Sequence, residues 1–275
     1  MQDKTLNKIA FIGAGNMARA IAVGLANSGV AGSNIIIANP SLERRQVLAA
    51  DVGGQHTESN LEAAEFADIV VLSVKPHLIQ SVCQELAQGI DVSNKLFISV
   101  AAGTTVAQIQ QALACQAAVV RVMPNTPAQL GLGMSGLFAS AQVSQAQKTA
   151  ADNLTAAIGE VIWLESEEQI NHITAVAGSG PAYFFLFMEA MQAQAQAFGF
   201  TEQESRLLVQ QTALGAAQMV VNNDVAISTL RENVTSKGGT TFAALEQFRA
   251  EGLASTVSNA MNAALTRAEE MARGE

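Results

Sequence analysis

A glycine-rich turn joins the first strand-like run of the chain, residues 8–12, to its first segment with helical spacing, residues 16–28. The turn and the start of the helix read Gly13, Ala14, Gly15, Asn16, Met17 and Ala18, which is a G-x-G-x-x-A pattern. The first glycine permits a tight turn, the second lets the backbone approach a pyrophosphate, and the small third residue lets the helix pack closely on the strand. Because strand, turn and helix stand in the required order, the pattern predicts a dinucleotide-binding unit. The alternative is an ordinary glycine turn in an α/β protein.

The rest of the first 165 residues continues this alternation of short apolar runs and helical segments. The strand-like runs are almost continuous in Val, Ile and Leu, as expected for strands buried on both faces of a parallel sheet. We expect strands at residues 8–12, 34–38, 68–74, 95–100 and 117–123, and helices at residues 16–28, 42–50, 78–87 and 106–113. Two weaker strands are expected at residues 136–139 and 160–164, on either side of a helix at residues 145–158. Repeated βα units predict an α/β Rossmann fold, with a doubly wound and mostly parallel sheet.

The pattern changes after Trp163, beyond which only helical periodicity is present, rich in Ala, Met, Leu and Gln. We therefore predict a Rossmann domain over residues 1–165 and an all-α domain over residues 166–275. Within the second domain, the helix expected at residues 204–221 is apolar around much of its circumference. A buried face of this size in a terminal half predicts an obligate homodimer.

The composition of the 275-residue chain excludes several classes of protein and site. A formal net charge of −9 argues against nucleic-acid binding. Cys83 and Cys115 stand in no C-x-x-C or Cys/His cluster, so we expect reduced thiols and neither a disulfide framework nor a metal site. The longest apolar stretch, residues 173–188, is interrupted by Gly-Ser-Gly-Pro and predicts a buried helix with its approach loop rather than a membrane span. The polar start of the chain carries no signal-peptide pattern, so we expect a cytoplasmic protein.

The end of the second strand indicates which dinucleotide is bound. NAD-binding proteins place Asp or Glu there, to accept hydrogen bonds from the ribose 2′-hydroxyl. This chain has Asn39, Pro40 and Ser41 instead, and Arg44 and Arg45 follow within the next helix. Asn and Ser donate hydrogen bonds to a 2′-phosphate, and Arg44 or Arg45 adds positive charge, so the sequence favours NADPH, with NADH as the alternative. Both arginines could equally lie on a solvated helix face.

Three further loops follow strands at the edge of the sheet where Rossmann-type folds bind their ligands. The first two loops contain Val74, Lys75 and Pro76, and then Ala101, Ala102 and Gly103. Lys75 is either a catalytic residue or a residue that orients its loop, whereas the small residues of the second loop leave room for the nicotinamide ribose. The third loop, residues 123–127, holds two prolines and predicts a rigid wall beside the nicotinamide.

Two glycine-rich stretches interrupt the helical half. In residues 178–183, Ser179 or Gly180 caps a helix and Pro181 suits its first turn, which is a complete structural reason for this stretch. The second stretch consists of Ser236, Lys237, Gly238, Gly239, Thr240 and Thr241. It leads into a helix at residues 242–249, and its free N–H groups, its hydroxyls and the helix N-terminus predict an anion site fit for a carboxylate. The alternative is a simple helix cap.

These motifs, in this order and spacing, resemble the Δ1-pyrroline-5-carboxylate reductase family. The resemblance rests on FIGAGNMA, VKPH, RVMPNTPA, AVAGSGPAYFF and ENVTSKGGTT, and it extends over essentially the whole chain. Members of that family reduce Δ1-pyrroline-5-carboxylate to L-proline, the final step of proline biosynthesis, with NAD(P)H and usually with a preference for NADPH. They join an N-terminal Rossmann domain to a helical domain that interlocks with a second subunit, and their dimers often assemble into decamers.

The resemblance also implies roles for individual residues. Contacts with the cofactor are implied for Gly13, Ala14, Gly15, Asn16, Met17, Ala18, Asn39, Ser41, Asn60, Val74, Lys75, Pro76, Ala101, Ala102 and Gly103, and a place near the nicotinamide for Asn233. Thr240 and Thr241, with the loop before them, are implied to hold the substrate carboxylate. Lys237 stands where the family commonly has proline, and the loss of that stiffening puts substrate affinity in question.

Hydride transfer to a protonated cyclic imine needs positioning more than covalent help from the protein. We expect the carboxylate loop to fix the approach of the imine carbon and Thr241 to hydrogen-bond the ring nitrogen. No Asp, Glu or His is an evident general acid. The alternatives are another imine reductase, a β-hydroxyacid dehydrogenase and a non-catalytic NADP sensor. A β-hydroxyacid dehydrogenase needs a lysine on a helix, whereas Lys237, the only lysine in residues 168–275, is expected in a loop.

Overall fold

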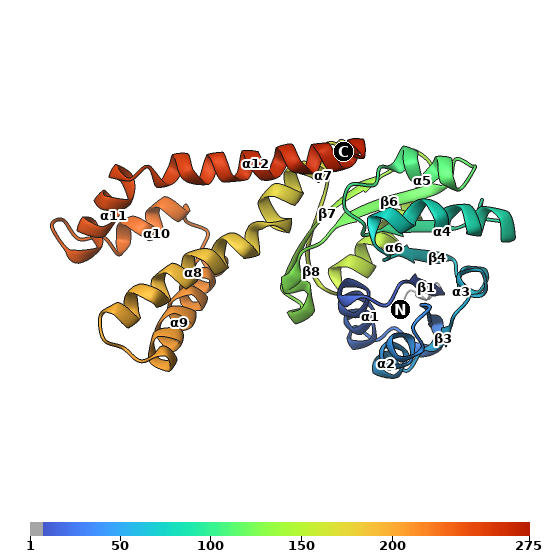
Figure 1. Ribbon diagram of the computed structural model, residues 1–275, viewed down its shortest axis with the longest axis horizontal. Helices are drawn as coiled ribbons and strands as arrows, with labels where there is room; N and C mark the ends of the chain where they lie inside the picture. The colour runs from blue at the N-terminus through green and yellow to red at the C-terminus, as the bar shows by residue number, and fades with distance from the viewer. Residues whose placement is uncertain (1–7) are drawn as a thin grey trace. The chain divides into compact units, whose positions relative to one another are not determined.

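A computed structural model describes residues 8–275 and contains the predicted Rossmann sheet (Figure 1). Within these residues the sheet has eight strands in the order β3-β2-β1-β4-β5-β6-β7-β8. The first six strands are parallel, whereas β7 is antiparallel to β6 and β8 is parallel to β7. The strands are β1 (Ile9–Ile12), β2 (Ile35–Ala38), β3 (Gln55–Thr57), β4 (Ile69–Leu72), β5 (Leu96–Ser99), β6 (Ala118–Met123), β7 (Gly133–Ala139) and β8 (Gly159–Trp163). The prediction of a doubly wound, mostly parallel sheet is confirmed.

Helices cover both faces of this sheet because its central strands bury side chains on both sides. The helices α1 (Asn16–Asn27), α2 (Leu42–Val52) and α6 (Gln145–Ala156) pack their apolar residues against one face. The other face is covered by α4 (Pro76–Gly89) and α5 (Val106–Ala112). Phe11 belongs to the first layer and Ile12, the next residue, to the second, as the two-residue period of a strand requires.

Besides two short 3₁₀ helices (Gly32–Asn34 and Thr126–Leu130), a strand and the α-helix that follows it were not predicted in this part. The strand β3 has the sequence Gln-His-Thr, lies at the edge of the sheet and carries no apolar run. The helix α3 (Asn60–Phe66) is only seven residues long. Ser59 caps it by accepting a hydrogen bond from the N–H of Glu62, so the S-x-x-E signature of a helix start was present in the sequence.

Every regular element that the structure describes after Trp163 is helical, as predicted. These elements are α7 (Gln169–Ile173), a π-helical turn (Thr174–Gly178), α8 (Gly180–Ala197), α9 (Glu202–Val221), α10 (Ile227–Asn233), α11 (Thr240–Ala250) and α12 (Leu253–Arg273). The prediction of a glycine-rich approach loop before α8 is wrong, because residues 174–178 form the π-helical turn. Asn125 stabilises it, since its Nδ2 donates a hydrogen bond of 3.1 Å to the carbonyl of Ala177.

The chain divides into two compact units. One comprises Met1–Ser179 together with Ala264–Glu275, so the last turns of α12 belong with the Rossmann sheet, and the other is Gly180–Ala263. This division lies beyond the predicted boundary between residues 165 and 166, and the start of the helical region, through α7 and the π-helical turn, is packed with the Rossmann unit. The predicted domain limits stay a prediction.

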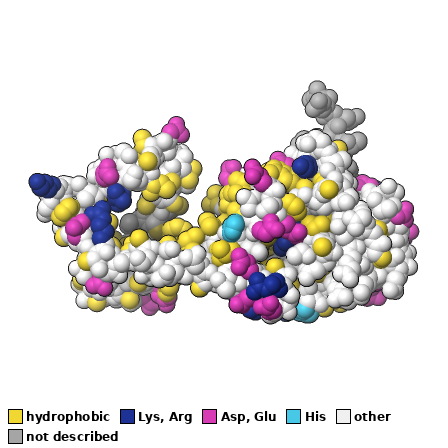
Figure 2. Space-filling model, turned by 90° about the horizontal axis from the view of Figure 1, so that it is seen from above, with side chains coloured by type: hydrophobic (Ala, Val, Ile, Leu, Met, Phe, Trp, Pro, Cys, Tyr) yellow, Lys and Arg dark blue, Asp and Glu magenta, His cyan; other side chains and the backbone are white. Residues whose placement is uncertain are grey.

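Large apolar side chains lie on the surface of the second unit in the single chain. Phe184, Phe185 and Leu186 of α8 are 68%, 63% and 68% exposed, and Leu207 and Leu214 of α9 are more than half exposed. Hydrophobic side chains are accordingly visible at the surface in Figure 2. The sequence predicted a buried helix over residues 173–188, and within one chain α8 is not buried. Across residues 8–275, no helix combines the length and the apolar character needed to cross a membrane.

Candidate active site

The carboxyl ends of four neighbouring strands bring the predicted nucleotide-binding loops together. β2, β1, β4 and β5 are adjacent and parallel, and the chain order reverses between β1 and β4. Open α/β sheets bind their ligands outside the carboxyl ends of the strands at this kind of switch point. The loops that follow these strands contain Gly13, Asn39, Val74 and Ala101, so the sequence placed the loops at the correct edge.

Gly13 is required by the geometry of the first turn. Its φ is +107° and its N–H donates a 2.8 Å hydrogen bond to the carbonyl of Ala38. A Cβ at this position would lie 2.5 Å from the carbonyl oxygen of Ser73. The Ser73 hydroxyl in turn donates to the carbonyls of Ile12 and Gly13, each at 3.0 Å. Ser73 thus holds the turn against β4, a role that the sequence analysis missed.

Gly15 serves a different purpose, because a Cβ built on it meets no atom within 4 Å. It is the N-cap of α1, with φ −86° and ψ 179°, and no side chain caps the helix. The first turn of α1 holds no acidic residue, so its N–H groups and the positive end of its dipole are free for an anion. Ala18, the small third residue of the motif, is 1% exposed and packs into the core as predicted.

The end of β2 lacks an acid and is built by hydrogen bonds around Asn39. The Oδ1 of Asn39 accepts from the N–H of Ala14 at 3.4 Å, which links the β2 loop to the glycine turn. Its Nδ2 donates to the carbonyl of Ser41 at 3.4 Å. The Ser41 hydroxyl caps α2 by accepting from the N–H of Arg44. This end of the site therefore presents amide and hydroxyl groups without a carboxylate for a 2′-hydroxyl.

The two adjacent arginines have different surroundings. Arg45 is 8% exposed and its NH1 donates to the carbonyls of Asn39 and Pro40 at 2.9 and 3.1 Å, while its NH2 pairs with Glu58 at 3.4 Å. Arg45 thus supports the loop from inside. Arg44 is exposed and makes no ion pair within the described part of the chain, so it is the cation that remains available to a ligand.

The two loops after β4 and β5 contain the other predicted cofactor residues. Lys75 is exposed and is the N-cap of α4, with Pro76 at the first helical position. Ala101 is buried and its N–H donates to the Ser99 hydroxyl at 3.4 Å, while Gly103 has φ +72°. Asn60 opens α3, and its Nδ2 donates to Glu85 of α4 at 2.8 Å.

The predicted substrate loop lies in the second unit, between α10 and α11. Gly238 has φ +73°, and the N–H of Gly239 donates to the carbonyl of Ser236 at 3.0 Å. Gly239 is the N-cap of α11 without a side-chain cap, and no acid stands in the first turn. Thr240 and Thr241 are the first two residues of this helix, and Asn233 is the last residue of α10. The loop thus presents free N–H groups and hydroxyls, with the exposed Lys237 beside them.

Thiol and metal chemistry find no support around these loops. Burial raises the pKa of Cys83 to about 12, so this thiol is protonated at neutral pH, and both Cys83 and Cys115 are free. Among residues 8–275, no cluster of three or more His, Cys, Asp or Glu side chains could hold a metal ion.

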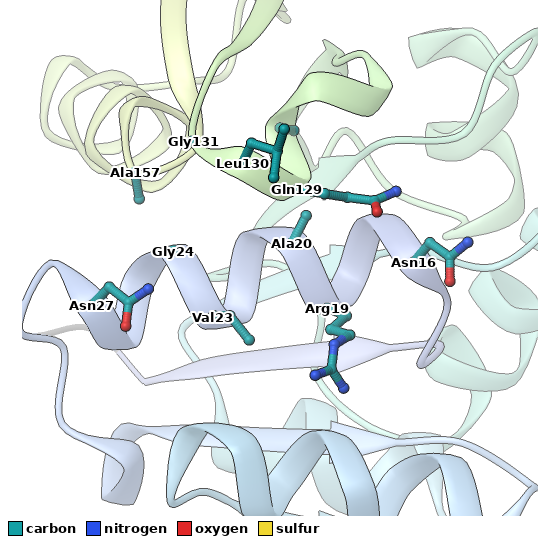
Figure 3. A pocket seen from close by; sticks show the side chains of 11 residues that line it. Asn16, Arg19, Ala20, Val23, Gly24, Asn27, Gln129, Leu130, Gly131 and Ala157 are labelled. Carbon is teal, nitrogen blue, oxygen red and sulfur yellow. The ribbon is translucent and has the colours of Figure 1, made fainter. Parts of the chain in front are cut away.

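A separate hollow of about 470 Å³ runs along α1, between this helix and the 3₁₀ turn Thr126–Leu130 (Figure 3). Gly24 lets the segment around Ala157 approach α1 closely, since a Cβ on Gly24 would lie 2.6 Å from the carbonyl oxygen of Ala157. Arg19 is the charged residue of its lining, and it pairs with Asp51 of α2. We assign no chemistry to this hollow.

Comparison with known proteins places both halves of the chain. The family model described as pyrroline-5-carboxylate reductase dimerisation matches residues 167–271, and the model described as NADP oxidoreductase, coenzyme F420-dependent, matches residues 8–103. The chain is 56% identical to a pyrroline-5-carboxylate reductase of Vibrio alginolyticus, over 96% of this chain and 97% of that one.

Two solved structures extend this likeness to the fold. A pyrroline-5-carboxylate reductase from Coxiella burnetii is 42% identical with a TM-score of 0.92, over 97% of this chain and 99% of that one. The Plasmodium falciparum pyrroline carboxylate reductase, solved with NADP bound, is 29% identical with a TM-score of 0.86, over 97% and 98% of the two chains.

Proposed function

The chain belongs to the pyrroline-5-carboxylate reductase family, and from this premise we propose that it reduces the C=N bond of Δ1-pyrroline-5-carboxylate with NAD(P)H to give L-proline. It is an NAD(P)H-dependent oxidoreductase of proline biosynthesis. The observation that carries this function is that the likeness to reductases of the family covers both the nucleotide-binding part and the helical part of the chain.

The residues at the carboxyl edge of the sheet fit NADPH. The open face of Gly15 and the uncapped N-terminus of α1 suit a pyrophosphate, and Asn39, Ser41 and Arg44 suit a 2′-phosphate, because they supply donors and a cation where NAD-binding proteins have an acid. Ala101 and Gly103 leave the space that a nicotinamide ribose needs. When bound, the cofactor supplies the hydride.

We assign the substrate carboxylate to the loop that ends in Thr240 and Thr241. The uncapped N–H groups of α11 and the two hydroxyls are donors for a carboxylate, and Lys237 adds a positive charge to the same loop. Anchoring the carboxylate fixes the ring, and the Thr241 hydroxyl hydrogen-bonds the ring nitrogen, which carries the added proton after reduction. Binding and orientation at these residues supply the rate enhancement, because a protonated imine accepts a hydride without a protein nucleophile.

The chain forms a homo-oligomer, and we assign its finer assembly as follows. The exposed apolar faces of α8 and α9 lie within the region matched to dimerisation, so burying them requires a second subunit. We propose a homodimer, with association of dimers into decamers as the larger assembly. We further propose a cytoplasmic location, which the two free cysteines favour because unpaired thiols persist in reducing compartments.

The test is the fall in NADPH absorbance with purified protein, with and without Δ1-pyrroline-5-carboxylate, followed by identification of proline. Oxidation that depends on the imine and yields proline supports the proposal. NADPH binding without oxidation by this substrate would contradict it and point to another imine or a keto acid. A β-hydroxyacid dehydrogenase is disfavoured because Lys237 lies in the loop between α10 and α11 rather than on a helix.

A further inference from the structure

Glu167 makes two contacts far away in the sequence. It stands between β8 and α7, and its side chain is 26% exposed. Its Oε1 accepts a hydrogen bond of 2.7 Å from the backbone N–H of Val106, 61 residues away. The same oxygen accepts a bond of 2.8 Å from NH1 of Arg121, 46 residues away.

Arg121 holds this carboxylate in place. It lies on β6, between β5 and β7, and its side chain is 4% exposed. A buried guanidinium without a carboxylate partner is strongly destabilising, and a charge-assisted pair is short and directional. The ion pair therefore fixes the Glu167 oxygen at one position, from which it reaches the start of α5.

Val106 is the first residue of α5, directly after the loop of residues 101–105 that carries Ala101 and Gly103. Thr105 and Gln108 form a reciprocal capping box at the same helix start. The hydrogen bond from Val106 to Glu167 thus anchors the N-terminus of α5 to a segment that is distant in the sequence. The middle of the loop lies close to α12, since a Cβ on Gly103 would lie 3.2 Å from Cβ and the carbonyl oxygen of Met271.

We propose that Glu167 is a positioning residue for the nicotinamide end of the cofactor. Through the N–H of Val106 it holds the loop of residues 101–105 in the conformation that receives the nicotinamide ribose, and Arg121 orients its carboxylate. Glu167 is the first residue of the region matched to dimerisation, so this contact connects that region to the cofactor loop. The inference rests on the proposed function, in which this loop contacts the cofactor.

The experiment measures the binding of two ligands to two variants at Glu167. Glu167→Ala removes the acceptor, whereas Glu167→Gln keeps an Oε1 that can accept from both Val106 and Arg121. Glu165→Gln is the matched control, since Glu165 is exposed, carries the same charge and makes no side-chain hydrogen bond or ion pair within residues 8–275. Binding of NADPH is measured beside binding of adenosine 2′,5′-bisphosphate, which has the 2′-phosphate end and no nicotinamide ribose.

We expect Glu167→Ala to weaken NADPH binding by roughly tenfold and to leave adenosine 2′,5′-bisphosphate binding unchanged. Glu167→Gln is expected to keep most of the NADPH affinity, although both substitutions lower the thermal unfolding temperature because Arg121 loses its charged partner. Unchanged NADPH affinity in Glu167→Ala, or equal weakening of both ligands, would overturn the inference, the second result because it signals a general loss of structure.

A second substitution covers the case in which Glu167→Ala does not fold. Val106→Pro removes the N–H that donates to Glu167, and its ring displaces the carboxylate that lies 2.7 Å from this nitrogen. It also replaces a buried side chain, and proline suits the first position of a helix. Thr105, with φ −83° and ψ 161°, already has the extended backbone that precedes proline. Val106→Ala is its control, because it keeps the N–H. Selective loss of NADPH affinity in Val106→Pro alone supports the inference, and equal affinities in the two variants would refute it.

Failure of the proposed function is separable from failure of this inference. Wild-type protein that binds NADPH without reducing Δ1-pyrroline-5-carboxylate would contradict the proposed reaction. The comparison of NADPH with adenosine 2′,5′-bisphosphate needs binding alone, so it still reports whether Glu167 positions the loop.

Discussion

Gly13 and Gly15 allow the cofactor site to be tested by two substitutions of the same size with opposite effects. At Gly15 an added methyl group meets no protein atom within 4 Å, and the backbone has φ −86°, which alanine adopts freely. Loss of glycine flexibility and the poorer N-cap largely offset each other, so the free energy of unfolding should stay within about 1 kcal/mol of wild type. The methyl group would occupy the open face where the pyrophosphate approaches α1. We expect Gly15→Ala to weaken NADPH binding by roughly tenfold or more, the loss of about one charge-assisted hydrogen bond.

Gly13→Ala, in contrast to Gly15→Ala, should lower the free energy of unfolding. Its φ of +107° costs alanine about 1–2 kcal/mol, and the contact at 2.5 Å with the Ser73 carbonyl adds about 1–3 kcal/mol. The free energy of unfolding should therefore fall by about 2–5 kcal/mol, measured by denaturant unfolding, with NADPH affinity measured by titration of the folded protein. A Gly15→Ala protein that binds NADPH as tightly as wild type would refute the reasoning, because the open face would then not be where the phosphates lie.

Three further predictions test the chemistry of the site and the core. Asn39→Asp should reduce the ratio of kcat/KM for NADPH to that for NADH by roughly tenfold, because a carboxylate repels a 2′-phosphate and accepts a hydrogen bond from a 2′-hydroxyl. Arg44→Ala should reduce this ratio less. An unchanged ratio in both variants would contradict the assignment of the 2′-phosphate to these residues. Thr241→Ala should lower kcat/KM for the imine by roughly tenfold or more, whereas Thr241→Ser keeps the hydroxyl and should retain most activity; equal activity in both would exclude the ring-nitrogen contact. The folded pKa of Cys83 is raised from 9.0 to about 12, so the folded state holds a proton that the unfolded state has lost between these pH values. The free energy of unfolding should consequently fall as pH rises through this window, by at most about 1.4 kcal/mol per pH unit, and this slope should be smaller in Cys83→Ala.

The sequence predicted most clearly the strands whose residues are buried on both faces, and more weakly β7 and β8 at the end of the sheet. The strands β1, β2, β4, β5 and β6 read as almost continuous apolar runs because helices cover both sides of the sheet, whereas a strand with one solvated face alternates apolar and polar residues. The sequence did not predict β3, because β3 is a three-residue edge strand with two exposed side chains. Its neighbour α3 could have been found, since Ser59 and Glu62 form a helix-start signature.

The local geometry of the candidate site follows from the sequence where a short motif determines it, and not where distant residues do. The roles of Gly13, Gly15 and Ala18 follow from one motif of six residues. Nothing local separates Arg44 from Arg45, because only the fold shows that Arg45 turns inward to the carbonyls of its own loop. The π-helical turn depends on Asn125, and the contact of Glu167 with Val106 joins segments 61 residues apart, so no spacing rule could have indicated either.

Hydride transfer from NADPH to the imine carbon of Δ1-pyrroline-5-carboxylate can be followed by isotope tracing. NADPH that carries deuterium at both hydrogen positions of the nicotinamide C4 is incubated with the protein and the imine, and the product is analysed by mass spectrometry. We expect proline that carries one deuterium on the former imine carbon. Proline without deuterium, or consumption of NADPH without labelled proline, would contradict hydride transfer to this carbon.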